Sequence, residues 1–298
     1  MKKLAFAITW LAVGAAPAIA ADLPVKAPVA VAPAFSWSGC YVGGSAGWIG
    51  GDGRYDLRPA GSYLNATGAA APPNLAGTGD FPENRAALSH SYAPRDSGAL
   101  VGVQAGCNQQ AGRFVFGVEG DWSWSSLRNT SDAAFAAFAN VGNPAFTNAA
   151  HAEHVSTRLD WLGTFRGRAG FAWDRLYLYA TGGLAIGDVR SDTNVTFGVV
   201  GAPVYNGAVH IGSGSSWQVG WTAGAGGEYA FSPQWSLKAE YLYVDLGTFS
   251  YFSPLVAAAA PAAVGPGYGW RTSVTERDHI VRVGLNYKFG ATPVVARY

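Results

Sequence analysis

Charged residues are scarce in this 298-residue chain, which holds 20 Lys and Arg against 19 Asp and Glu. Together they make up 13% of the sequence, whereas a soluble domain carries about 25%. The formal net charge of +1 gives no basic excess that would attract nucleic acid, and no acidic tail is present. We therefore expect no nucleic-acid partner.

Long apolar runs are also lacking. The run from Leu4 to Ala16 is shorter than the ~20 residues that a membrane-spanning helix needs. Lys2-Lys3 precedes it and Ala18-Ile19-Ala20 follows it, which is the pattern of a secretory signal peptide over residues 1–20. We predict cleavage between Ala20 and Ala21. Because no other segment offers a helical span, a membrane location requires a β-barrel.

Only two cysteines occur, Cys40 and Cys107. Both lie on the apolar face of a proposed strand, and secretion permits a disulfide. Directly opposite residues of an antiparallel pair share a face, so a cross-strand bridge near the periplasmic ends is favoured. Two free thiols are the alternative.

Glycine and aromatic residues are abundant, with 40 Gly, 11 Trp, 14 Tyr and 15 Phe, and apolar residues alternate with polar or small ones. From His279 to Phe289, one parity holds Val281, Val283, Leu285, Tyr287 and Phe289, and the other holds Arg282, Gly284, Asn286 and Lys288. A β-strand places these two sets on opposite faces. Without helices to cover the apolar faces, we expect those faces to contact lipid.

Eight segments alternate in this way, at about residues 37–49, 97–110, 114–125, 156–173, 176–189, 216–231, 235–249 and 273–289. In the fifth, either Leu176 and Leu178 or Tyr177 and Tyr179 face outward. Tight turns at 111–112, 173–175 and 232–234 contrast with long segments at 50–96, 127–155, 190–215 and 250–272. The sequence therefore predicts an all-β fold, an eight-stranded antiparallel transmembrane β-barrel with short periplasmic turns and four long extracellular loops.

Aromatic residues gather near both ends of these segments, as the two interfaces of a bilayer favour. Near the short turns are Trp37, Phe114, Phe116, Phe171, Trp173, Tyr229, Phe231, Trp235, Tyr287 and Phe289; near the long segments are Trp48, Trp122, Trp124, Trp161, Trp217 and Tyr243.

Several short motifs resemble small alphaproteobacterial outer-membrane β-barrel proteins, often labelled porin-family or surface-antigen proteins. They are the Ala21-Asp22-Leu23-Pro24 start, Trp37-Ser38-Gly39-Cys40-Tyr41-Val42-Gly43-Gly44, Gly117-Val118-Glu119-Gly120-Asp121 and Val283-Gly284-Leu285-Asn286-Tyr287-Lys288-Phe289. The resemblance implies an OmpA-like barrel over residues 37–289, after a Pro/Ala-rich periplasmic leader at 21–36. It also implies lipid, lipopolysaccharide and the barrel-assembly machinery as partners.

Two terminal features follow from the same resemblance. Such barrels commonly end on an aromatic residue read by the assembly machinery, but here the tail 290–298 follows Phe289, so Phe289 and Tyr298 are both candidates. Some relatives are thought to link their N-terminal amine to peptidoglycan, which would make Ala21 the linked residue. An unattached leader is the alternative.

Charged residues on the polar parity are expected to line the lumen. They are Glu119, Asp121, Asp160, Glu228 and Glu240 against Arg166, Arg168, Lys238, Arg282 and Lys288. Unpaired charges in a narrow interior are costly, and eight strands leave room only for side chains, so we expect a lumen mostly plugged by paired charges. The alternative is a small-solute or ion channel with Arg166, Arg168 and Arg282 as its filter.

The sequence contains no clear set of catalytic or metal-binding residues. His279 beside Asp278 lacks a third residue at a spacing that implies a triad. His151, Glu153 and His154 lie in an Ala/Asn-rich segment expected to be a solvated loop rather than a metal site. We expect no enzyme, cofactor or metal, but an integral outer-membrane barrel with a structural, envelope-integrity role, displaying loops to external surface ligands.

Overall fold

The computed structural model describes residues 35–61, 82–139, 147–198, 207–257 and 269–289. The chain divides into two units, Met1–Pro33 and Ala34–Tyr298, and the first lies outside the described residues. The predicted cleavage between Ala20 and Ala21, the peptidoglycan link at Ala21 and the tail 290–298 also lie outside them. No helix of the described segments is long and apolar enough to cross a membrane.

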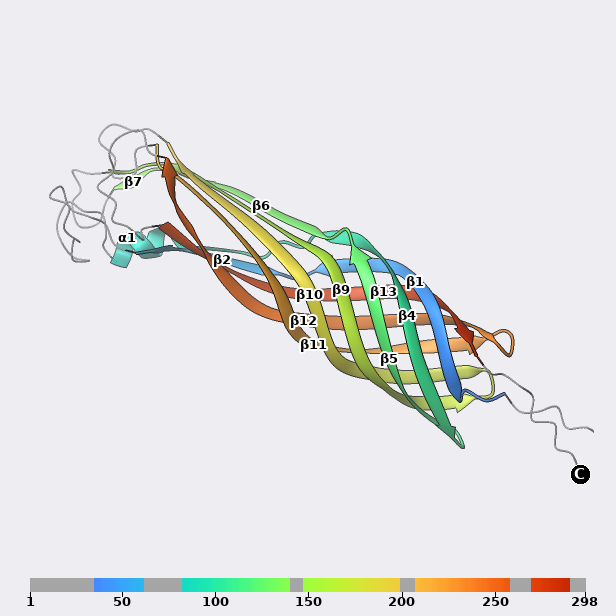
Figure 1. The fold of residues 1–298 in the computed structure, drawn as a ribbon. Helices are drawn as coiled ribbons and strands as arrows, with labels where there is room; N and C mark the ends of the chain where they lie inside the picture. Colours follow the sequence, from blue (N-terminus) through green and yellow to red (C-terminus); the bar gives the residue numbers. More distant parts are fainter. Residues whose placement is uncertain (1–34, 62–81, 140–146, 199–206, 258–268, 290–298) are drawn as a thin grey trace, which may run out of the picture. The chain divides into compact units, whose positions relative to one another are not determined.

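Eight long strands form a closed antiparallel ring (Figure 1). In ring order they are β1 (Gly39–Gly51), β4 (Ser97–Ala111), β5 (Phe114–Ser125), β9 (His151–Trp173), β10 (Leu176–Phe197), β11 (Val209–Ala230), β12 (Trp235–Ala257) and β13 (Gly269–Lys288). The ladder from Tyr41 opposite Lys288 to Gly51 opposite Asp278 joins β1 to β13 and closes the ring. The eight ring strands occur in the same order along the chain as around the ring, so the predicted eight-stranded barrel is confirmed.

Three tight turns lie at one end of the ring. Gly112 joins β4 to β5 with φ 63°, and Asp174 joins β9 to β10 with φ 51°. This left-handed backbone conformation is one that Gly and Asp adopt readily. Between β11 and β12, the Ser232 hydroxyl accepts a hydrogen bond from the backbone N–H of Trp235 at 2.9 Å.

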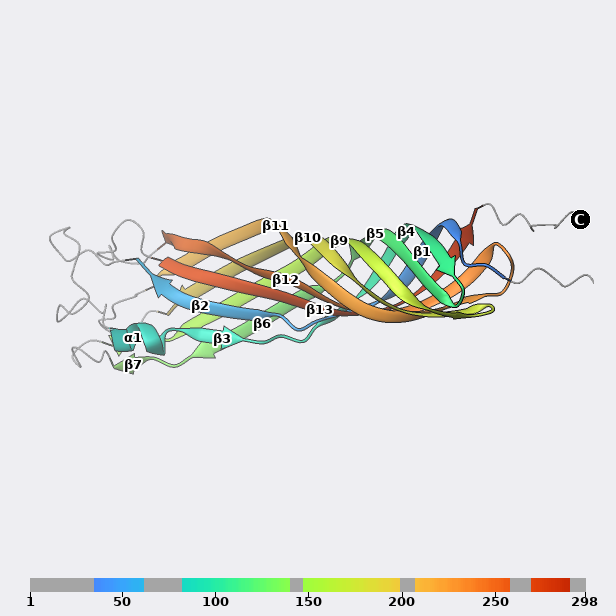
Figure 2. The same cartoon turned by 90° about the horizontal axis from the view of Figure 1, so that it is seen from below.

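The opposite end carries an extension of the barrel, which we define as β2 (Arg54–Ala60), β3 (His90–Tyr92), β6 (Arg128–Phe135) and the ends of β9 to β13 (Figure 2). β2 pairs with β13 and β3, and β6 pairs with β9. A helix, α1 (Pro82–Ala87), and a hairpin of β7 (Phe138–Ala139) and β8 (Thr147–Asn148) complete the described elements. Parts of the four predicted loops are therefore strands, because neighbouring strand edges supply backbone hydrogen-bond partners there.

Apolar side chains cover the outer face of the ring. Val281, Val283 and Leu285 of β13 all point outward, and Val283 is 56% exposed. In β10, Leu176 and Leu178 are exposed while Tyr177 and Tyr179 are buried, which decides the orientation that the sequence left open.

Trp37 does not belong to the predicted aromatic band. Its ring is buried against Tyr177, because the segment before β1 enters the lumen.

A β-bulge in β9 reverses the inward parity of that strand. Gly187 of β10 pairs with Leu162, but Val189 pairs with Leu159, so β9 carries one extra residue over this interval. Leu159 consequently points inward and is 1% exposed, whereas Asp160 points away from the lumen. Strict alternation predicts Asp160 in the lumen and its neighbour Leu159 on the outer face, and both predictions are wrong because alternation does not allow for a bulge.

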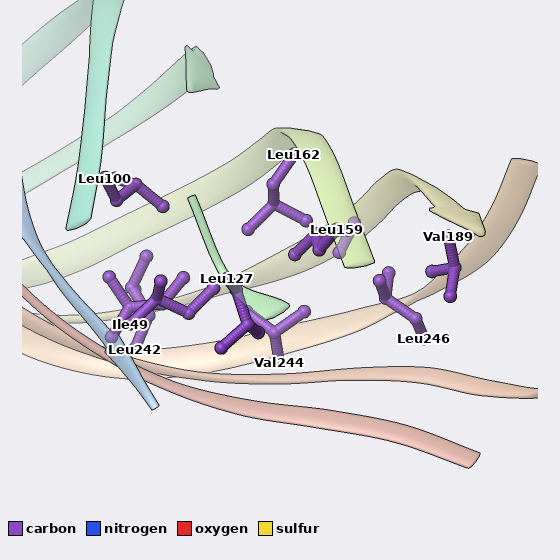
Figure 3. Packing of buried hydrophobic residues seen from close by; sticks show 11 residues of the cluster. Ile49, Leu100, Leu127, Leu159, Leu162, Val189, Leu242, Val244 and Leu246 are labelled. Carbon is purple, nitrogen blue, oxygen red and sulfur yellow. The ribbon is translucent and has the colours of Figure 1, made fainter. Parts of the chain in front are cut away.

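Apolar side chains also fill much of the interior. The turn end holds a cluster of Trp37, Val115, Ala172, Tyr177, Tyr179 and Ala230. Where the extension begins, a second cluster includes Ile49, Leu100, Leu127, Leu159, Leu162, Val189, Leu242, Val244 and Leu246, which point toward one another from several strands (Figure 3). We call this second cluster the apolar layer. A third cluster, around Tyr55, Leu57 and Trp270, lies within the extension.

Candidate functional site

Glu119 of β5 is the centre of a buried charge network in the lumen. Its carboxylate accepts hydrogen bonds from Arg166 Nη2 at 2.6 Å, Lys238 Nζ at 2.9 Å and Arg168 Nη1 at 3.0 Å. The Tyr41 hydroxyl donates to it as well, at 2.6 Å. The Glu119, Arg166, Arg168 and Lys238 side chains are all fully buried, so solvent screens these interactions little.

Two further carboxylates hold Arg166 and Arg282. Arg282 Nη1 lies 2.8 Å from Asp121 Oδ1, and Arg282 Nη2 lies 2.7 Å from Glu240 Oε2. Arg166 Nη1 donates to Glu240 Oε1 at 2.9 Å. Each guanidinium therefore contacts more than one carboxylate, and the planar donor geometry of arginine suits such bridging.

Arg168 extends the network toward the turn end. Its Nη2 donates to Glu228 Oε2 at 2.8 Å, and its guanidinium lies 4.0 Å from the centre of the Tyr179 ring. Glu228 also accepts hydrogen bonds from Ser236 Oγ at 2.5 Å and Asn286 Nδ2 at 2.8 Å.

Strand register explains why these eight residues meet. Glu119 is directly opposite Arg166, Glu228 is opposite Lys238, and Glu240 is opposite Arg282 in their antiparallel ladders. Directly opposite residues share a face, and here that face is the lumen. The four cations and four carboxylates balance, so the network as a whole is neutral.

Two of the ten predicted lumen charges lie outside this network. The prediction for Asp160 is wrong, because the β9 bulge turns it outward, where it pairs with Arg190 at 3.3 Å. Lys288 lies at the turn end, where Nζ donates to the Ser36 carbonyl and sits 4.4 Å from the centre of the Phe35 ring. Its position at the end of β13 keeps it away from the central carboxylates.

Cys40 and Cys107 are joined by a disulfide between directly opposite residues of β1 and β4. Their Cα atoms are 3.9 Å apart, and both side chains lie on the outer face near the turn end. The bridge is therefore separate from the charge network and ties together the first two strands of the ring.

The apolar layer beside the network was not predicted from the sequence. Leu242 follows Glu240 by two positions along β12, and Ile280, directly opposite it, precedes Arg282 by two positions along β13; both are fully buried. Continuing the inward parity past the last charge would have found them. Leu159 required knowledge of the bulge.

Other residues considered from the sequence are distributed differently. Asp278 points inward and His279 outward, so they do not form a catalytic pair; the His279 ring Nδ1 instead lies 2.7 Å from the Tyr241 hydroxyl. His151 and Glu153 are not in a solvated loop, because they are buried residues of β9, whereas His154 points outward and contacts Asp132 at 2.6 Å.

Comparison with known proteins places the chain among outer-membrane barrels. Residues 8–289 match the family described as "Outer membrane protein beta-barrel domain". The chain is 33% identical to the 31 kDa outer-membrane immunogenic protein of Brucella melitensis biotype 1, over 91% of this chain and 93% of the relative. It is 28% identical to a 22 kDa outer membrane protein of Rhizobium leguminosarum bv. viciae, over 78% of this chain and 72% of the relative.

Among solved structures, the outer membrane protease OmpT from Escherichia coli aligns with a TM-score of 0.44 and 11% identity, over 86% of this chain and 98% of that chain. The family match covers most of the sequence and agrees with the closed ring and its outward apolar face. The chain therefore belongs to the outer membrane protein beta-barrel domain family and is an integral β-barrel of the bacterial outer membrane.

Proposed function

We propose that this barrel has a structural role in envelope integrity and surface display, and that it neither conducts solutes nor catalyses a reaction. The observation that carries the proposal is the neutral network of eight buried charges across the lumen. These eight charges are buried and bound to one another, so they do not form an exposed ring of one sign that would select an ion.

The energetics of passage support a closed lumen. An ion entering from the turn end would have to separate charge pairs that are fully buried, and removing one partner of such a pair is strongly unfavourable. Beyond the network it would meet the apolar layer, where an unpaired charge loses its hydration without compensation. Both barriers lie in series along the same lumen.

Surface display is supported by the extension and by the relatives. The extension lies at the end opposite the tight turns, and bacterial barrels place short turns in the periplasm and long connections outside. The similar Brucella proteins are named immunogenic outer-membrane proteins. We propose that the extension of this chain is likewise presented to the cell's surroundings.

Labelling of intact cells tests the display. Thr196→Cys places a thiol on the outer surface of the extension, and Gln109→Cys places one near the turn end. A membrane-impermeant maleimide should label the first variant and leave the second unlabelled until the cells are opened. The reverse pattern would overturn the proposed orientation.

Deletion of the gene tests the structural role. The deletion strain should become more sensitive to detergent, and the wild-type chain should restore resistance. Vesicles containing the refolded chain should exclude small sugars as well as empty vesicles do. Unchanged detergent resistance together with rapid sugar entry would favour the porin-like alternative.

A further inference from the structure

His90, His151 and Glu153 come together inside the extension, away from the charge network. His90 lies on β3, while His151 and Glu153 lie two residues apart on β9 and share its inward face. The His90 Nδ1 atom is 2.8 Å from Glu153 Oε1, and the His151 Nε2 atom is 3.3 Å from the same oxygen. One ligand atom from each residue lies within 4.8 Å of the others.

His151 is buried without a hydrogen bond to either ring nitrogen among the described residues. Its side chain is 1% exposed, and its approach to Glu153 lacks hydrogen-bond geometry. A buried nitrogen left without a partner costs free energy, so it calls for an explanation such as an ion. A metal bound at Nε2 would supply a partner for that nitrogen.

Neighbouring side chains hold these groups in place. The Phe135 ring stacks on His90 at 3.7 Å and on His151 at 4.8 Å between centroids, which restricts both imidazoles. The Tyr92 hydroxyl donates to Glu153 Oε2 at 2.5 Å, leaving Oε1 directed at the two histidines. Hydrogen bonds that orient a ligating carboxylate are typical of metal sites.

We propose that His90 Nδ1, His151 Nε2 and Glu153 Oε1 bind one divalent transition metal of the zinc class, with water as the fourth ligand. Two imidazoles and one carboxylate are a donor set that Zn²⁺ favours. Ligand atoms around tetrahedral Zn²⁺ lie about 3.4 Å apart, given bonds of about 2.0–2.1 Å. The distances from Glu153 Oε1 to His90 Nδ1 and to His151 Nε2, 2.8 Å and 3.3 Å, are close to that value.

The position of the site suggests what the metal does. Among the described residues no ladder joins β3 to β6, so the extension has an open seam between these two strands. β6 pairs with β9, and the three proposed ligands connect β3 directly to β9 across this seam. A bound metal would therefore fasten the paired strands β2 and β3 to the rest of the extension.

Zn²⁺ titration of the full refolded chain tests the site. Isothermal titration should show one equivalent of Zn²⁺ for the wild type, and Co²⁺ should give the visible absorption of tetrahedral coordination. His90→Ala, His151→Ala and Glu153→Gln should each weaken Zn²⁺ binding at least tenfold. His154→Ala is the matched control, because His154 lies on the same strand but faces outward, and it should bind like wild type.

Folding of each variant is checked by its heat-dependent mobility in gels, so a misfolded protein is not scored as a lost site. Hydrogen exchange gives a second readout: Zn²⁺ should slow exchange of the β3 amides in wild type and in His154→Ala, but not in His151→Ala. Absence of stoichiometric Zn²⁺ binding by the wild type, or equal binding by all four folded variants, would overturn the proposal.

Discussion

Lys238 reaches across the lumen to Glu119, with Nζ 2.9 Å from Oε1 and 3.0 Å from Oε2. The two residues lie on β12 and β5, which are four strands apart in either direction around the ring of eight. Their ion pair therefore joins opposite walls of the barrel. It also occupies the path that a permeating solute would take.

Glu119→Gln should destabilise the folded barrel by about 3–5 kcal/mol, because it leaves Lys238, Arg166 and Arg168 buried with too little opposite charge. Urea unfolding in lipid vesicles, followed by tryptophan fluorescence, measures this loss. Asp160→Asn is the control; its carboxylate lies outside the lumen and is partly exposed, so the unfolding midpoint should barely move. Equal midpoints for both variants would show that the network does not stabilise the fold.

The outer face of β13 should tolerate charge poorly in its lipid-contacting portion. Val283→Arg places a cation near the middle of the outward apolar band and should cost about 2–4 kcal/mol in a bilayer. Val256→Arg makes the same substitution at an equally exposed valine of the extension, where water solvates the cation. Vesicle unfolding of the two variants compares them directly, and a similar loss in both would contradict the assigned lipid face.

A buried acid pair should make stability depend on pH. Asp278 and Glu276 project inward on the extension side of the apolar band, and none of their carboxylate oxygens has a hydrogen-bond partner among the described residues. Burial raises the pKa of Asp278 from 3.8 to about 8. Burial, together with the charge of Asp278, raises the pKa of Glu276 well above its ordinary value.

Because both pKa values are raised on folding, the unfolded chain releases these protons at lower pH than the folded barrel does. The contribution of these two groups to the free energy of unfolding should therefore fall as pH rises from about 4 to about 8. Asp278→Asn should match wild type near pH 4 and exceed its stability at pH 9 by up to ~5 kcal/mol. Asp192→Asn, at an exposed position, should leave the pH profile unchanged.

Alternation alone predicted the ring, its outward face and most lumen charges. Residues such as Glu240 and Arg282 were found because parity depends only on position within a strand, and their pairing follows from the register. Leu159 and Asp160 were misplaced because a bulge changes parity without a distinctive residue to mark it. β2 and β6 were not predicted either. Their strand conformation depends on pairing with β13 and β9, which are distant from them in the sequence, so their local composition does not indicate a strand.

The approach of His90 to His151 and Glu153 could not be predicted from the sequence. His90 is 61 residues from His151, and β3 has only three residues, too few for alternation to be recognised. The contact arises because β2 carries β3 alongside β13, a pairing with no local sequence signal. The sequence did draw attention to His151 and Glu153 but paired them with His154, which lies on the opposite face of β9.

Single-channel recording in planar bilayers tests the closed lumen most directly. The refolded wild-type chain should give no stable conductance steps. The combined variant Glu119→Ala, Arg166→Ala, Lys238→Ala and Leu242→Ala removes side chains from both the network and the apolar layer, and folded molecules of it should conduct. Stable, reproducible steps from the wild-type chain, abolished by substitution of Arg166 or Arg282, would contradict the account and identify an ion channel.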